Sequence, residues 1–135
     1  MMRSELREHV FKMLFQIEFN DAEDMPEHMR YYFEGLDNAR EKDMDYIRQK
    51  YEAVVSRIPE IDGILNETAI GWKTSRMNKV DLTILRLALY EMRWDDAVPE
   101  GVAINEAVEL AKKFGGDGSS SFVNGVLGKL ASQES

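Results

Sequence analysis

Apolar residues recur along this chain every three to four positions, which is the spacing of one face of an amphipathic helix. Prolines and short polar segments separate the periodic stretches, and alternating runs of β-branched residues, which would indicate strands, are weak. The periodic stretches predict helices at residues about 4–19, 26–36, 41–57, 61–74, 78–94, 102–114 and 120–131. The pattern therefore predicts an all-α fold of six to seven helices.

The ends of several predicted helices carry local signals. Ser4 is the expected N-cap of the first helix, because its hydroxyl can accept a hydrogen bond from a free backbone N–H of the first turn. Pro59 is expected to stop the third helix, since proline cannot donate the hydrogen bond that a helix interior requires. Gly115 and Gly116 are expected to end the sixth helix.

The segment 78–94 is apolar on most sides, which is typical of the buried central helix of a bundle. Arg86 interrupts this apolar surface, and a buried arginine requires a carboxylate or several carbonyl groups, so we expect a structural ion pair. The strongest change in composition falls near Gly71. We therefore expect two small helical bundles, residues about 1–70 and 71–135, packed as one compact domain.

Four small or polar residues inside predicted helices need their own explanation. Gly125 and Gly128 lie within the last helix, where each glycine costs up to about 1 kcal/mol relative to alanine. We expect close approach of a neighbouring helix to compensate for this cost. We interpret Asn105 and Asn124 as polar joints between helices, with ligand binding as the alternative.

The chain carries a formal net charge of −8, which argues against nonspecific nucleic-acid binding driven by phosphate neutralisation. The acidity is uneven, because residues 1–70 hold a balance of −7 and residues 71–135 a balance of −1. Any RNA site must therefore be a local basic patch, and its complexes should be sensitive to salt.

Catalytic motifs are absent from the sequence. There is no cysteine, and His9 and His28 are not at metal-ligand spacing on one helix face. The sequence has no nucleophile elbow, phosphate-binding loop or dinucleotide fingerprint. We therefore predict a non-enzymatic protein without a metal site or cofactor. No segment resembles a signal peptide or is apolar for long enough to span a bilayer, so we expect a cytoplasmic protein that does not enter the membrane.

Basic and aromatic residues share one face of the first helix. Arg3 and Arg7 are four residues apart, and Phe11 and Phe15 continue the same spacing. Arginine beside an exposed aromatic ring can bind single-stranded RNA, because the guanidinium meets phosphate and the ring stacks on a base. In the alternative interpretation, both phenylalanines are core residues and the arginines only solubilise the helix.

The segment from Gly115 to Ser121 joins two predicted helices and is rich in glycine and serine. Free backbone N–H groups at the start of the following helix could hold a phosphate. The alternative is a simple helix stop followed by a serine N-cap.

The sequence resembles the NusB family over essentially its whole length. The most specific motifs are Ile-Asn-Glu-Ala-Val-Glu-Leu-Ala-Lys at 104–112 and Phe-Val-Asn-Gly-Val-Leu at 122–127. The other matching residues are Arg7, Glu8, Leu14 to Gln16, Ile61, Asp62, Trp72, Arg76, Asp81, Ile84 to Ala88, Tyr90, Glu91, Val98, Pro99, Val102 and Ala103.

The resemblance implies an all-helical fold and a role in transcription antitermination. It implies binding to the boxA element of nascent ribosomal RNA together with the small-subunit ribosomal protein NusE, and association with other Nus factors and RNA polymerase. The RNA contacts carried over from the family are Arg3, Arg7, Phe15, Gly118, Ser119, Ser120, Ser121 and Phe122. The contacts to NusE carried over are Asp81 and nearby Arg76.

The sequence departs from the family pattern at two places. Many members begin with a run of arginines, whereas only Arg3 and Arg7 stand here. Some members carry an acidic residue where Gly118 stands, and here the acid is at Asp117. Both departures fit a modest RNA affinity that depends on the protein partner.

Two other functions are alternatives. The same fold serves as the RNA-binding domain of a ribosomal RNA methyltransferase, but these 135 residues contain no methyl-donor-binding region. The chain could also be a helical adaptor, for example a homodimer, that binds proteins and has little RNA affinity of its own.

Overall fold

The computed structural model describes residues 1–68 and 73–133. Within these residues the chain forms seven α-helices and two short 3-10 helices and no strand, which confirms the all-α prediction. The chain divides into two compact units, Met1–Val55 and Ser56–Ser135, so the division falls earlier than the expected position near residue 70. Among the residues that the structure describes, each helix is too short or too polar to traverse a lipid bilayer.

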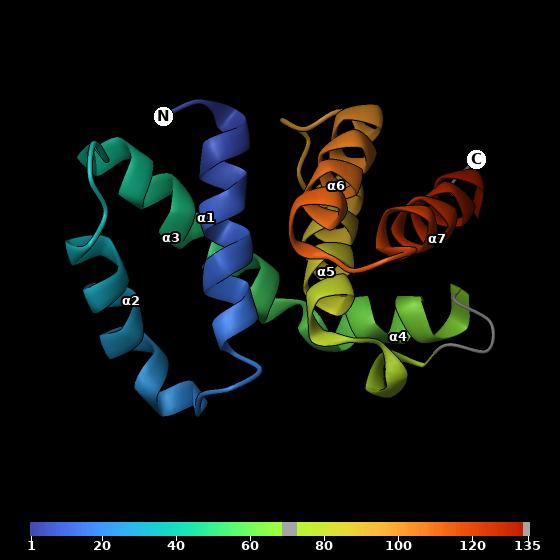
Figure 1. The fold of residues 1–135 in the computed structure, drawn as a ribbon, viewed down its shortest axis with the longest axis horizontal. Coiled ribbons are helices and arrows are strands. Elements are labelled where there is room, and N and C mark those ends of the chain that lie inside the picture. Colours follow the sequence, from blue (N-terminus) through green and yellow to red (C-terminus); the bar gives the residue numbers. More distant parts are fainter. Residues whose placement is uncertain (69–72, 134–135) are drawn as a thin grey trace. The chain divides into compact units, whose positions relative to one another are not determined.

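The first unit is built from three α-helices and one 3-10 helix, whose arrangement can be followed in Figure 1. In chain order they are α1 (Arg3–Gln16), η1 (Ala22–Asp24), α2 (Met25–Glu34) and α3 (Glu41–Ser56). Helices α1 and α3 bury Val10, Met13, Ile47 and Val54 completely, at the three- to four-residue spacing that their sequence predicted. Their burial removes these side chains from water and drives the helices together.

Polar and aromatic side chains join the helices of the first unit. His9 of α1 is hydrogen-bonded to the hydroxyl of Tyr32 in α2 through its Nδ1 atom. The guanidinium of Arg3 lies 5.3 Å from the centre of the Tyr46 ring in α3. These contacts connect α1 to both of the other helices of its unit.

The described residues of the second unit form four α-helices and a second 3-10 helix, whose arrangement can be followed in Figure 1. They are α4 (Ile58–Thr68), η2 (Thr74–Arg76), α5 (Lys79–Trp94), α6 (Glu100–Phe114) and α7 (Ser119–Gln133). Helix α5 contacts α4, α6 and α7, and α6 also packs against α7. The prediction that residues 78–94 form the central helix of a bundle is therefore confirmed within this unit.

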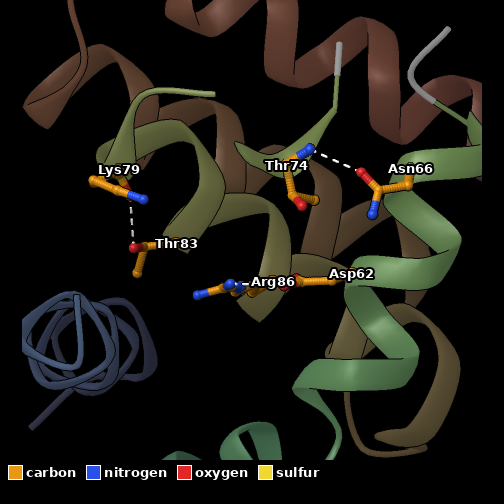
Figure 2. Close-up of polar contacts among 6 residues, drawn as sticks. All are labelled: Asp62, Asn66, Thr74, Lys79, Thr83 and Arg86. Atoms are coloured by element: carbon orange, nitrogen blue, oxygen red, sulfur yellow. Dashed lines mark hydrogen bonds and ion pairs between the residues drawn. The ribbon is translucent and has the colours of Figure 1, made fainter. Parts of the chain in front are cut away.

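Arg86 forms the ion pair that its position in an apolar helix predicted. Its guanidinium binds the carboxylate of Asp62 in α4, with 2.7 Å between Nη2 and Oδ2 (Figure 2). A second contact joins η2 to α4, because the backbone N–H of Thr74 donates to Oδ1 of Asn66 at 2.8 Å (Figure 2). The predicted extension of α4 to Thr74, which includes Ala69 and Trp72, falls partly outside the described residues.

One expected helix boundary was wrong. Helix α1 begins at Arg3 with Met2 at the N-cap, so Ser4 lies inside the helix rather than capping it. Helix α3 ends at Ser56, close to the expected end, and Pro59 lies at the second position of α4. Proline is tolerated there because the first N–H groups of a helix have no partner within the helix.

Two expectations about helix packing were also wrong. A Cβ atom added to Gly125 or Gly128 would meet no described atom within 4 Å, so neither glycine permits a close helix contact. Asn105 and Asn124 are exposed, and this excludes them as buried polar joints. All four residues lie on the solvent side of their helices.

Candidate functional site

The two arginines of the first helix have different surroundings. Arg3 is exposed, whereas Arg7 is only 4% exposed. Their four-residue spacing places them on one face of α1. That face is exposed at Arg3 in the first turn and buried at Arg7 one turn later. Arg3 is therefore the accessible cation of the pair, and RNA contact by Arg7 stays a prediction.

Three phenylalanines form a row from the core to the surface at the end of α1. Phe11 is buried, Phe15 is half-buried and Phe19 is 65% exposed. The ring centres are 6.1 Å apart for Phe11 and Phe15 and 5.0 Å apart for Phe15 and Phe19. The core interpretation is correct for Phe11. Phe19 was missed as a candidate, although it continues the same four-residue spacing.

The α6–α7 loop is held in one conformation by hydrogen bonds. The backbone N–H of Gly116 donates to Oγ of Ser119 at 3.1 Å, and the Ser119 N–H donates to the Gly116 carbonyl at 3.1 Å. Gly118 has a φ of +82°, a value that favours glycine. Gly115 ends α6 as predicted, and Ser119 is the first residue of α7. The Ser119 hydroxyl closes this turn by accepting from Gly116.

The three serines at the start of α7 differ in accessibility. Ser119 is 4% exposed, Ser120 is half-buried and Ser121 is exposed. Phe122 is also half-buried, and its N–H donates to the Gly118 carbonyl at 2.9 Å. Ser121 is therefore the serine of this set that is most accessible to a ligand.

The start of α5 carries a reciprocal capping arrangement. Oδ1 of Asn78, the N-cap residue, accepts from the Asp81 N–H at 2.8 Å, and its Nδ2 donates to Oδ2 of Asp81 at 3.0 Å. Asp81 is 6% exposed, and its Oδ1 is buried with no hydrogen-bond partner among the described residues. Arg76, the last residue of η2, is exposed.

A pocket of about 340 Å³ brings these two regions of the second unit together. Its α5 side is formed by Met77, Asn78 and Asp81, and the opposite side by residues 116–119 and Phe122. Asp81, predicted as a protein contact, thus shares one pocket with the predicted RNA contacts Gly118, Ser119 and Phe122. Arg76, Ser120 and Ser121 do not line it.

Asn78 and the pocket itself were missed by sequence reasoning. The spacing of Asn78 and Asp81, three residues apart before an apolar run, is a capping signal that would have indicated Asn78. No sequence signal indicates that the α6–α7 loop, almost forty residues later, lies opposite the start of α5. That juxtaposition comes from the packing of α6 and α7.

Burial perturbs the hydrogen-bonded pair of His9 and Tyr32 in the first unit. Burial lowers the pKa of His9 below its ordinary value of 6.5, and nearby Lys12 lowers it further. Burial also raises the pKa of Tyr32 to about 12. His9 therefore favours the neutral form in the folded protein. The described residues hold no group of three or more histidine or acidic side chains arranged to bind a metal ion.

Comparison with known proteins identifies relatives along almost the whole chain. Residues 4–132 match the model of the NusB family. The chain is 50% identical to the transcription antitermination protein NusB of Agathobacter rectalis, with 97% of this chain and 100% of that protein covered. It is 48% identical to the protein of the same name from Lachnoclostridium phytofermentans, with 96% and 98% covered.

Solved structures show the same fold. The chain matches NusB of T. maritima with a TM-score of 0.87 and 34% identity, covering 98% of this chain and 92% of that one. It also matches a chain in a crystal structure of the antitermination factors NusB and NusE in complex with double-stranded RNA. That match has a TM-score of 0.78 and 25% identity and covers 98% of this chain and 99% of the other.

Proposed function

Because this chain belongs to the NusB family, we propose that it is a transcription antitermination factor that binds boxA RNA of nascent ribosomal RNA transcripts together with NusE. In this role it joins the Nus-factor complex on RNA polymerase, in the cytoplasm, and performs no catalysis of its own. The observation that carries the proposal is the match over nearly the full length to relatives named as transcription antitermination proteins. The structural match to a complex that contains NusE and RNA supports both partners.

The RNA side of the proposal rests on exposed groups in both units. In the first unit, Arg3 offers a cation and the partly exposed rings of Phe15 and Phe19 offer stacking surfaces. In the second unit, the exposed residues are Gly118 in the loop before α7 and Ser121 in the first turn of α7. Within each unit, these groups can contact single-stranded RNA without the arginine run that many family members carry.

The charge of the chain favours an RNA affinity that depends on NusE. The net charge is −8, and Arg7 is buried, which leaves few accessible cations near the predicted RNA contacts. Each phosphate contact releases counterions, so a complex with few contacts is weak, and its sensitivity to salt comes from those few contacts alone. NusE would supply further contacts when both bind the same RNA.

A titration of boxA RNA with this protein, with and without NusE and at two salt concentrations, tests the proposal. We expect weak binding alone and clearly tighter binding with NusE present. A control RNA of the same length with a scrambled boxA sequence should bind more weakly under every condition. Absence of RNA binding even with NusE would remove the proposed mechanism.

A protein-binding adaptor with little RNA affinity is the second candidate function. The burial of Arg7 and the acidic balance of −7 over residues 1–70 favour it. In that case NusE binds with unchanged affinity whether or not boxA RNA is present. Sedimentation of the protein alone would then test the homodimer form of this alternative.

A further inference from the structure

A groove runs between α2 and α3 in the first unit. It consists of two adjoining hollows of about 350 and 400 Å³, which share Pro26, Met29 and Arg48 in their walls. The backbones of α2 and α3 come close at few points, so long side chains separate the two helices and leave this space between them. The groove is a different surface from the pocket at the start of α5.

The apolar lining of the groove follows both helices. Met29 and Phe33 lie one turn apart on α2, and Met44 lies one turn before Arg48 on α3. Phe33 and Met44 are half-buried, so a ligand can reach both side chains. Methionine side chains are flexible and adapt to the shape of a partner. The ten residues of α2 give the groove a length of about 15 Å, which fits an amphipathic helix with apolar side chains every three to four residues.

Both arginines of the groove wall have carboxylate partners within the protein. The guanidinium of Arg30 lies 3.8 Å from the carboxylates of Glu27 and Glu34. Arg48 donates from Nη1 to Oδ1 of Asp45 at 3.0 Å. Three carboxylates therefore match the two cations, and the groove offers no excess positive charge to a phosphate.

The charge that remains along the groove is negative. The three elements that form it, η1, α2 and α3, hold eight acidic and four basic residues. Glu52 is exposed in the groove wall and has no basic partner among the described residues. Opposite charges across an interface favour a partner, and like charges exclude it. A basic partner is therefore favoured, whereas RNA or a second copy of this chain, whose net charge is −8, would bring more negative charge.

We propose that the groove between α2 and α3 binds a basic amphipathic helix of a protein partner. The apolar stripe of that helix contacts Phe33 and Met44, and one of its lysine or arginine side chains pairs with Glu52. This surface shares no residue with the RNA and NusE contacts of the proposed function. The inference therefore goes beyond that function and does not depend on it.

A designed peptide serves as the probe. It is capped, spans about four helical turns, and carries leucine every three to four residues with lysine at the other positions. Binding is followed by NMR on the full-length protein, labelled on its methionine methyl groups, at constant ionic strength. We expect saturable shifts of the Met29 and Met44 signals and no shift of Met92 in α5. A peptide of the same composition without the leucine stripe should bind at least about tenfold more weakly. Absent shifts, or equal binding of the two peptides, would overturn the proposal.

The groove can be blocked without changing the core, because Ala22 is exposed at its wall. Ala22→Arg introduces a long cation and should weaken peptide binding by about tenfold or more. Ala97→Arg adds the same charge at an exposed position of the second unit and should change binding by less than about twofold. Equal effects of the two variants would contradict binding in the groove, with thermal unfolding confirming that both variants are folded.

A charge exchange tests the pairing with Glu52. Glu52→Lys should weaken the lysine peptide by about fivefold or more, whereas Glu5→Lys, the same change at an exposed position of α1, should change binding by less than about twofold. Each lysine of the peptide is then replaced in turn by glutamate. One of these peptides should bind Glu52→Lys more tightly than the wild type. Failure of every such peptide to recover binding would remove Glu52 from the site.

Two results would assign the groove to another occupant and overturn the proposal. Shifts of Met29 and Met44 that grow with protein concentration, together with a dimer in sedimentation, would assign it to a second copy of the chain. Shifts of the same signals by boxA RNA, with displacement of the peptide, would assign it to RNA. Failure of the protein to bind boxA RNA or NusE would overturn the proposed function alone, because the peptide titration is made without either of them.

Discussion

The guanidinium of Arg86 in α5 donates two hydrogen bonds to the carboxylate of Asp62 in α4, from Nε to Oδ1 at 2.9 Å and from Nη2 to Oδ2 at 2.7 Å (Figure 2). The side chains are 12% and 23% exposed, so the pair is largely withdrawn from water. Such paired geometry joins two helices in a fixed orientation.

Removal of the Asp62 carboxylate should therefore leave a poorly solvated cation. We expect Asp62→Ala to lower the free energy of unfolding by about 1–3 kcal/mol, measured by urea denaturation. Glu109→Ala, which breaks the exposed pair with Lys112, should cost less than about 0.5 kcal/mol. Similar losses in the two variants would show that the buried pair contributes no more than a surface pair.

Two glycines of the second unit should respond to alanine in opposite directions. A Cβ on Gly115 would lie 2.5 Å from Cβ of Ser119, so Gly115→Ala should destabilise the protein by about 1–3 kcal/mol. Gly125 lies in α7 with open space around it, and Gly125→Ala should stabilise by up to about 1 kcal/mol. Chemical denaturation of the two variants beside the wild type measures both effects, and a loss of stability in Gly125→Ala would contradict the prediction.

Burial of His9 makes stability depend on pH. Its pKa is lower in the folded protein than in the unfolded chain, so the unfolded chain binds the proton more readily. Stability should be highest above about pH 6.5 and should fall as the pH drops through the lowered folded pKa. Denaturation curves at several pH values check this trend. His9→Gln should flatten it, and an unchanged pH trend in this variant would contradict the prediction.

Arg3 should contribute to RNA affinity through its charge. Arg3→Ala should weaken boxA binding in the presence of NusE and reduce the salt slope by about 1, as for the loss of one phosphate contact. Arg30→Ala removes an exposed arginine elsewhere in the first unit and serves as the control. Equal effects of the two replacements would show that only total charge matters, and an unchanged affinity in Arg3→Ala would exclude Arg3 as a contact.

Helix periodicity predicted the features that depend on local spacing. The position of α5 at the centre of its bundle and the ion pair of Arg86 both follow from apolar residues at helical intervals. Spacing left the burial of Phe11 open between two interpretations, and the structure decides for the core. The sequence could not identify Asp62 as the partner of Arg86, because Asp62 lies 24 residues earlier and the sequence contains many other carboxylates.

The sequence predicted less of the candidate site, because packing between segments that are distant in the sequence determines which of its side chains are buried. Spacing alone places Arg3 and Arg7 together, and the structure exposes one and buries the other. The pocket joins Asp81 to a loop more than thirty residues later, which periodicity cannot reveal. The resemblance to the NusB family identified the candidate residues, and the fold shows how they are arranged.

The division of the chain into two units also separates its chromophores. Both tryptophans, Trp72 and Trp94, belong to Ser56–Ser135, while four of the five tyrosines lie in Met1–Val55. The indole of Trp94 is half-buried, with the Arg57 guanidinium 4.6 Å from its ring. Tryptophan emission therefore monitors the second unit alone, and tyrosine absorbance mainly the first. Following both signals in one denaturation experiment shows directly whether the two units unfold in a single cooperative transition.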